Sequence, residues 1–176
     1  MFYFRMWYVL LFLTGVFLSD LNAPLYEDSK LEILTTTNKE SHEILLHSTA
    51  HLLAMAVKEL YPEAKIAIGP ALSDRFYYDI DFPEFISNDD LPKIESKMIV
   101  LAKLNYDVEK LNLNKVNAID TFSQLNEDYK VEIIEDINNG DPISAYQQGD
   151  FVDLCRGPHV PSTGKIKYFK LLSTAG

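Results

Sequence analysis

Two spaced pairs of side chains in this sequence are able to bind a metal ion or to move protons. His47 and His51 are separated by four positions, and so are Cys155 and His159. On a helix a four-residue step brings side chains back to within about 40° of each other, so the first pair can point into one pocket. Three imidazoles and a thiolate suit zinc, and an imidazole can also activate water for hydrolysis. The residue types therefore predict either a metal site or a hydrolytic site.

Three other side chains are candidates for the same site. In the predicted strand before Cys155, alternation places Asp153 and Cys155 on one face, so Asp153 faces the pocket if Cys155 does. The alternative for Asp153 is a solvated carboxylate at a strand end. Lys130 fits an exposed surface position equally well. His42 lies five residues before His47, points elsewhere on the helix and is expected to be solvated.

Composition limits the classes of partner. The 176 residues, 47% of them hydrophobic, suffice for one domain with a core. With 16 basic and 26 acidic residues the net charge is −10, so the chain as a whole repels polyanions. A nucleic-acid substrate would therefore have to be held by local contacts or by another domain. The single cysteine excludes an internal disulfide, so nothing in the composition indicates an oxidising compartment.

Apolar spacing predicts a mixture of helices and strands. A helix is expected to begin at Ser41, as its cap, and to run to about Leu60. Two more helices are expected, one capped by Asp89 or Asp90 and one over 114–126. Alternating or apolar runs predict strands at 66–68, 76–81, 106–113, 129–134, 143–146, 151–154 and 166–172. Because strands and helices do not alternate regularly, the expected fold class is α+β, with a mostly antiparallel sheet packed with helices around a pocket lined by His and Cys.

The first 18 residues form an apolar leader that carries one charge, Arg5. A membrane-spanning helix needs about 20 apolar residues, and this stretch is shorter. No clean cleavage site with two small residues follows it, as a signal peptide would require. A signal peptide, a short anchor and the last strand of a broken upstream domain all stay open as explanations.

Five short motifs carry a family resemblance. They are His47-Ser-Thr-Ala-His51, Gly69-Pro70, Phe76-Tyr-Tyr-Asp, Asp128-Tyr-Lys-Val and Val152-Asp-Leu-Cys-Arg-Gly-Pro-His-Val-Pro161. Taken together they resemble the editing domain of threonyl-tRNA synthetases, the second additional domain that these enzymes share with alanyl-tRNA synthetases. The resemblance implies four parts. They are a leader of uncertain status (1–18), the end of an upstream ubiquitin-like domain with a linker (19–38), the editing domain (39–168), and the start of a linker to a missing catalytic domain (169–176).

The resemblance implies a hydrolase that acts on mischarged seryl-tRNA(Thr) and so maintains the fidelity of translation. The expected location is the cytoplasm, or an organelle or a membrane if the leader over 1–18 is a genuine signal. Serine lacks one methyl group of threonine, and one methyl group changes binding by only about 1–3 kcal/mol. A synthetic site therefore cannot exclude serine, whereas a second site that is too small for threonine can. Aminoacylation by this chain alone is not expected, since ATP would bind only in the missing aminoacylation domain.

Carried over to this sequence, the resemblance implies a catalytic pocket of six residues. Of these, His47 and Lys130 are expected to activate water or position the ester, Asp153 to recognise the amino or hydroxyl group, and His159 to align the ester. The full set consists of His47, His51, Lys130, Asp153, Cys155 and His159, with Tyr129 and Arg156 as further substrate-binding residues.

The sequence leaves open whether the His and Cys residues bind zinc. In alanyl-type relatives the His and Cys set binds zinc, whereas the threonyl-type domain is thought to work without metal. Metal-free editing is favoured here, because a nearby Lys130 ammonium would repel Zn²⁺; if zinc is bound, the ligands are His47, His51, Cys155 and His159. The expected partners are the acceptor end of tRNA(Thr) carrying serine and the remainder of the synthetase, with no stable membrane partner. The alternative is a non-catalytic zinc- or tRNA-binding remnant of a truncated synthetase.

Overall fold

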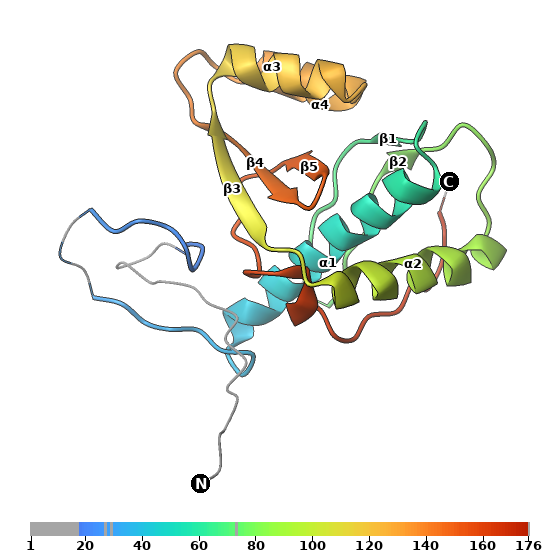
Figure 1. Ribbon diagram of the computed structural model, residues 1–176, viewed down its shortest axis with the longest axis horizontal. Coiled ribbons are helices and arrows are strands. Elements are labelled where there is room, and N and C mark those ends of the chain that lie inside the picture. The colour runs from blue at the N-terminus through green and yellow to red at the C-terminus, as the bar shows by residue number, and fades with distance from the viewer. Residues whose placement is uncertain (1–17, 27, 29, 73, 176) are drawn as a thin grey trace, which may run out of the picture.

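The computed structural model describes residues 18–175 with the exception of 27, 29 and 73, so the predicted leader, apart from residue 18, lies outside the described residues. Two helices and a small sheet surround the larger core, and a three-stranded sheet with two further helices forms a second packing unit beside it (Figure 1). No helix in the described part of the chain combines the length and apolar character needed to cross a membrane.

The longest element is helix α1 (Lys39–Leu60), which supplies much of the larger core. Apolar residues at helical spacing, such as Leu52 and Met55, turn one side of α1 inward. The sequence places the cap at Ser41, but Asn38, three residues earlier, holds the cap position and the helix begins at Lys39. The Ser41 hydroxyl instead donates a hydrogen bond to the Asn38 carbonyl at 2.6 Å, which satisfies it inside the first turn.

Helix α2 (Leu91–Leu104) lies alongside α1 (Figure 1) and contributes Ile94, Met98 and Leu101 to the same core. Its predicted acidic cap is confirmed only in part. The Asp90 carboxylate accepts the Ser87 backbone N–H at 2.9 Å, while the Ser87 hydroxyl accepts from the backbone of Asp89. This reciprocal capping box opens the short 3₁₀ turn η1 (Asn88–Asp90) that leads into α2.

The larger sheet is antiparallel and consists, in spatial order, of β3 (Val108–Leu113), β4 (Ile143–Gln148) and β5 (Phe151–Leu154). Helices α3 (Lys115–Gln124) and α4 (Asp128–Asp136) pack on it, and the second core holds Phe122, Ile134 and Ala145 among its fully buried residues. Strands β1 (Lys65–Ile66) and β2 (Ile80–Asp81) form a separate antiparallel pair, shorter than the runs predicted there. The expected α+β class with antiparallel strands is confirmed.

The predicted strand over 129–134 is wrong, because this stretch lies in helix α4. Its alternation of large apolar and polar residues also fits a helical period. Lys130 and Ile134, four residues apart, are 2% and 0% exposed, whereas Tyr129 and Ile133, also four apart, are each 37% exposed. Ile134 packs in the core beneath the sheet, and this packing favours the helical period over the strand period. Because Lys130 lies one helical turn before Ile134, its side chain turns inward as well.

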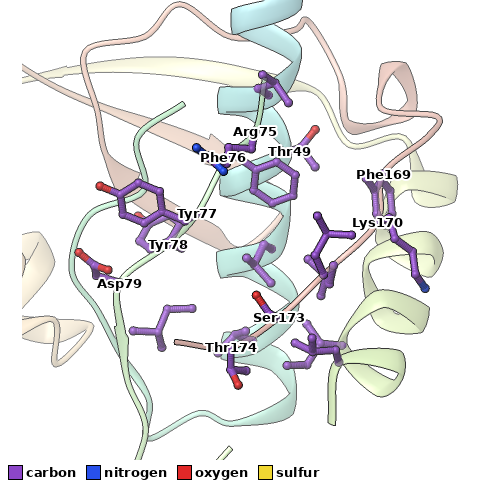
Figure 2. A pocket seen from close by; sticks show the side chains of 18 of the residues that line it. Thr49, Arg75, Phe76, Tyr77, Tyr78, Asp79, Phe169, Lys170, Ser173 and Thr174 are labelled. Carbon is purple, nitrogen blue, oxygen red and sulfur yellow. The ribbon is translucent and has the colours of Figure 1, made fainter. Parts of the chain in front are cut away.

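The predicted strand over 166–172 is also wrong, because the chain there is irregular and follows the 3₁₀ turn η2 (Thr163–Lys165). The backbone N–H of Leu171 donates to the Glu95 carboxylate at 2.9 Å instead of to a strand. This C-terminal segment and the segment around Tyr77 border an open groove of about 1800 Å³ along α1 (Figure 2).

A buried carboxylate joins the two packing units. Glu127, 5% exposed, lies between α3 and α4, and one of its oxygens accepts the Ile66 backbone N–H at 2.9 Å. Its other oxygen lies 2.7 Å from the Lys58 ammonium in the last turn of α1. Glu127 therefore ties the start of α4 to both β1 and α1.

Replacing Glu127 with alanine should lower the free energy of unfolding by about 2–3 kcal/mol, because the Ile66 amide and the Lys58 ammonium would lose a charged acceptor. Urea unfolding followed by circular dichroism measures this change. Glu59→Ala is the matched control, since the Glu59–Lys97 pair is 40% and 28% exposed and should contribute less than about 1 kcal/mol. Equal losses in both variants would contradict this role of Glu127.

Candidate functional site

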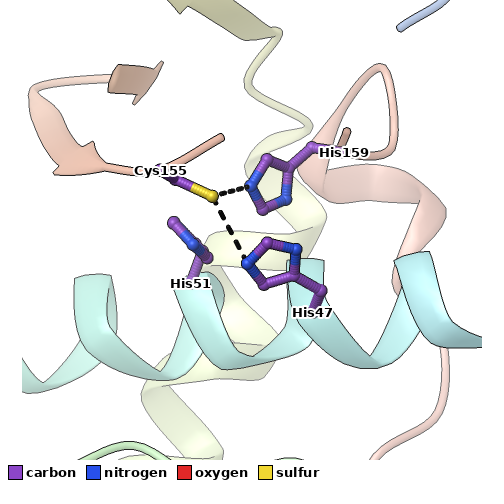
Figure 3. Close-up of side chains that lie close together, drawn as sticks. All are labelled: His47, His51, Cys155 and His159. Carbon is purple, nitrogen blue, oxygen red and sulfur yellow. Dashed lines mark hydrogen bonds between the residues drawn. The ribbon is translucent and has the colours of Figure 1, made fainter. Parts of the chain in front are cut away.

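The structure brings together the two pairs that the sequence singles out (Figure 3). Helix α1 presents His47 and His51, while Cys155 and His159 come from the turn that follows β5. The Cys155 Sγ atom lies 3.3 Å from Nε2 of His47 and 3.3 Å from Nε2 of His159. The four potential ligand atoms all lie within 4.8 Å of one another, and we call these four residues the His/Cys cluster.

The turn from Cys155 to His159 depends on Gly157. This residue has φ +74, a left-handed conformation that side chains rarely adopt, and an added Cβ would lie 1.9 Å from the Tyr146 hydroxyl oxygen. The Gly157 backbone N–H donates to Cys155 Sγ at 3.2 Å. The turn thereby folds both side chains back toward α1.

A buried ion pair adjoins the His/Cys cluster. The Asp153 carboxylate is 1% exposed, with one oxygen 2.6 Å from the Lys130 ammonium and the other 3.2 Å from Nδ1 of His51. Tyr78 donates its hydroxyl hydrogen to Asp153 and accepts a hydrogen bond from Lys130 at 3.1 Å. The six residues expected in the pocket therefore lie in one connected group.

Two members of the site do not follow from the sequence pattern. Tyr78 appears there only within an expected strand and the Phe76-Tyr-Tyr-Asp motif, with nothing to separate it from its neighbour Tyr77. Asp20 is distant in sequence, yet one of its oxygens accepts the His159 backbone N–H at 2.9 Å and the other accepts the Tyr146 hydroxyl at 2.5 Å. The Tyr146 ring packs edge-on against the His159 ring with centroids 4.5 Å apart, so Asp20 and Tyr146 brace His159 together.

Two predicted substrate-binding residues lie outside this group. The Tyr129 hydroxyl donates to the Asp81 carboxylate at 3.0 Å on the surface of α4. Arg156 has an exposed side chain, and its carbonyl accepts from Lys110 at 3.3 Å. Their expected contacts with substrate stay predictions.

Burial sets the protonation states of the His/Cys cluster. Desolvation lowers the pKa of His51 and of His159 well below the ordinary value of 6.5, and it also lowers the pKa of His47. Desolvation raises the pKa of the Cys155 thiol to about 12. At neutral pH the imidazoles are therefore uncharged and able to accept protons, whereas the thiol is protonated and is a poor nucleophile.

Two separations in the cluster match those between the ligands of a zinc ion. Zinc bound to nitrogen at about 2.0–2.1 Å and to sulfur at about 2.3 Å holds its tetrahedral ligands roughly 3.5 Å apart, close to the separations from sulfur to nitrogen found here. His47, His51, Cys155 and His159 would hold the ion, and bound zinc would lower the pKa of a coordinated water. Two rings have partners on their other nitrogen, His51 on Asp153 and His159 on Ser48.

The groove along α1 lies beside the cluster. Leu46, Thr49 and Leu53 line it at helical spacing, one or two residues from His47 and His51, and therefore on the neighbouring face of the helix. The tyrosine that contacts Asp153, Tyr78, also lines the groove (Figure 2). Tyr78 therefore connects the open groove to the buried ion pair.

The stability of the protein should fall as the pH falls below about 6.5. Unfolded His51 and His159 take up protons near pH 6.5, whereas the folded rings do so only at much lower pH. The unfolded state then binds more protons, so the free energy of unfolding decreases by up to about 2.7 kcal/mol per pH unit for the two groups. Urea unfolding between pH 8 and pH 5 in the presence of a chelator measures this slope.

Glutamine at both positions should flatten the slope, and glutamine at the exposed His42 should leave it unchanged. A wild-type slope in the double variant would show that other groups cause the loss.

Comparison with known proteins shows which family of enzymes this chain resembles in sequence. Residues 143–176 match the family described as the threonyl and alanyl tRNA synthetase second additional domain. The chain is 50% identical over 157 residues to a threonine–tRNA ligase of Geobacillus kaustophilus, covering 89% of this chain and 24% of the relative. It is 52% identical over 159 residues to that of Geobacter sp. strain M21, covering 90% and 25%. The chain thus spans about a quarter of the length of these curated relatives. About nine-tenths of the chain therefore matches one segment of threonyl-tRNA synthetases, and this match includes the second additional domain.

Proposed function

We propose that this chain is the editing module of a threonyl-tRNA synthetase and hydrolyses seryl-tRNA(Thr). The observation that carries the proposal is the neutral His/Cys cluster beside the Lys130–Asp153 ion pair, in a chain about half identical to threonine–tRNA ligases. Hydrolysis of an aminoacyl ester needs a base for water and a donor for the developing oxyanion. The site holds candidates for both.

His47 is the best placed general base. Its side chain is the only half-buried imidazole of the cluster in the described structure, and its lowered pKa leaves a lone pair available at neutral pH. The contact between Nε2 and the Cys155 thiol is 3.3 Å long, and a thiol is a weak donor, so a water molecule can replace it. The water attacks the ester carbonyl carbon and gives a proton to His47; the bond to the ribose oxygen breaks, and that oxygen takes up the proton.

Lys130 is the best placed donor for the oxyanion. Its ammonium has three N–H groups, of which one meets Asp153 and one meets Tyr78. We assign the third to the ester carbonyl oxygen, where negative charge develops in the transition state. Asp153 then acts as a positioning residue, because its carboxylate holds both Lys130 and His51 in place.

The groove is where we place the acceptor end of the tRNA. Phe76, Tyr77 and Phe169 offer aromatic surface there (Figure 2), and bases stack on such rings regardless of their identity. Tyr78 at the inner edge would lie next to the terminal ribose. On this proposal residues 39–168 form the body of the editing unit, and the flanking segments 19–38 and 169–176 add Asp20 and Phe169 to its site.

The purified chain should hydrolyse seryl-tRNA(Thr) and leave threonyl-tRNA(Thr) largely intact, as release of radiolabelled amino acid would measure. His47→Ala should slow the reaction by roughly 10²-fold or more, the usual contribution of a positioned acid–base group. Glu59→Ala, on the same helix but in a surface pair, is the control. Equal rates on both esters would exclude editing specificity. No hydrolysis together with tight zinc binding would favour a non-catalytic zinc- or tRNA-binding role.

Binding of tRNA to the isolated chain should be weak and strongly dependent on salt. The chain carries a net charge of −10, and its densest basic stretch holds Lys165, Lys167 and Lys170. Three phosphate contacts predict a slope of about −2 to −3 for the logarithm of the binding constant against that of salt concentration. Fluorescence titration of tRNA(Thr) at several salt concentrations gives the slope. Tight binding that persists in high salt would contradict the expectation.

A further inference from the structure

The hydroxyl group of Ser48 contacts the His/Cys cluster at Nδ1 of His159, the ring nitrogen that does not face Cys155. Ser48 follows His47 on α1, is 2% exposed, and has its Oγ atom 3.0 Å from Nδ1 of His159. The backbone N–H of Val160 donates to the same oxygen at 3.1 Å. Ser48 is therefore bonded both to the ring of His159 and to the chain that carries it.

Counting hydrogens gives this contact a direction. A serine hydroxyl has one hydrogen to donate, and Val160 already uses a lone pair of the oxygen. Buried hydroxyls on helices commonly donate to the carbonyl four residues earlier, as Thr49 does to Leu45 at 2.6 Å. Within the described part of the chain Ser48 makes no such bond, and Nδ1 of His159 is the acceptor within its reach. The hydroxyl hydrogen therefore points at Nδ1.

The tautomer of the His159 ring follows. A neutral imidazole that accepts at Nδ1 carries its proton on Nε2. Here Nε2 lies 3.3 Å from Cys155 Sγ, so the ring donates to sulfur, which also receives the Gly157 backbone N–H. The thiol hydrogen is then left for Nε2 of His47, also 3.3 Å away. The hydrogen bonds run in one direction, from Ser48 through His159 and Cys155 to His47.

We propose that Ser48 is a positioning residue that fixes His159 as the Nε2–H tautomer and thereby opposes metal binding by the His/Cys cluster. A metal ligand must present a lone pair, and in this tautomer the nitrogen that faces the cluster presents a hydrogen. Binding a metal through that nitrogen would require the proton to move to Nδ1 and the Ser48 hydroxyl to give up its acceptor. That a metal-free cluster serves editing rests on the proposed function, whereas the tautomer of His159 and its effect on metal binding do not.

Two measurements without tRNA test the proposal. In ¹⁵N-labelled chain with a chelator at pH 7.5, long-range ¹H–¹⁵N NMR correlations should identify His159 with a protonated Nε2 and a bare Nδ1. The opposite tautomer in the wild-type chain would overturn the proposal, whatever the behaviour of any variant. A chain that is inactive on seryl-tRNA would sink the editing function and leave this result intact.

Metal affinity gives the second test. The two possible directions of the Ser48–His159 hydrogen bond predict opposite changes in affinity when Ser48 is replaced. If Ser48 donates to the ring, Ser48→Ala should bind Co²⁺ or Zn²⁺ about threefold to tenfold more tightly than the wild type, the factor that one neutral hydrogen bond contributes. If Ser48 instead accepts from Nδ1–H, as the outer partner of a metal ligand does, its loss should weaken binding by about 10–100-fold, which would overturn the proposal. Thr49→Val removes the adjacent buried hydroxyl, whose bond goes to a backbone carbonyl, and should change neither the His159 tautomer nor the affinity.

Discussion

The site depends on the burial of one carboxylate. Asp153 is 1% exposed and sits where β5, α1, α4 and the segment carrying Tyr78 converge. A buried charge of this kind is tolerated only when it is paired and fully hydrogen-bonded, so Lys130, His51 and Tyr78 are held in place by electrostatic need as much as by packing. Asp153 therefore joins the two packing units, through its contacts with His51 and Tyr78, as well as forming part of the site.

Neutral groups adjoin the ion pair of Lys130 and Asp153. The imidazoles and the thiol of the His/Cys cluster are uncharged at neutral pH because burial disfavours their ionised forms. Hydrogen bonds inside such a poorly solvated network are stronger and more directional than in water. A site built in this way can hold a proton acceptor ready near an ester without relying on a charged nucleophile.

Sequence reasoning recovered what local geometry determines. The helical step between His47 and His51, and the tight turn between Cys155 and His159, can be recognised from spacing alone, and the fold class follows from the mixture of periods. The local pattern could not place Lys130, which the family resemblance alone assigned to the pocket, because its stretch fits two periods and only packing on the sheet selects the helix. Asp20 and Tyr78 come from distant segments, and no local pattern marks a contact made across more than 70 residues.

The carboxylate of Asp20 has a consequence for where this module begins. It belongs to the stretch before α1, which the family resemblance assigns to the end of another domain, yet it holds the backbone of His159 and the hydroxyl of Tyr146. A chain trimmed to start at Lys39, or even at Leu21, would retain every imidazole and the thiol of the cluster. It would lose the Asp20 carboxylate that holds the backbone of His159. The boundary of the folded core and the boundary of the working unit are therefore different positions in this sequence.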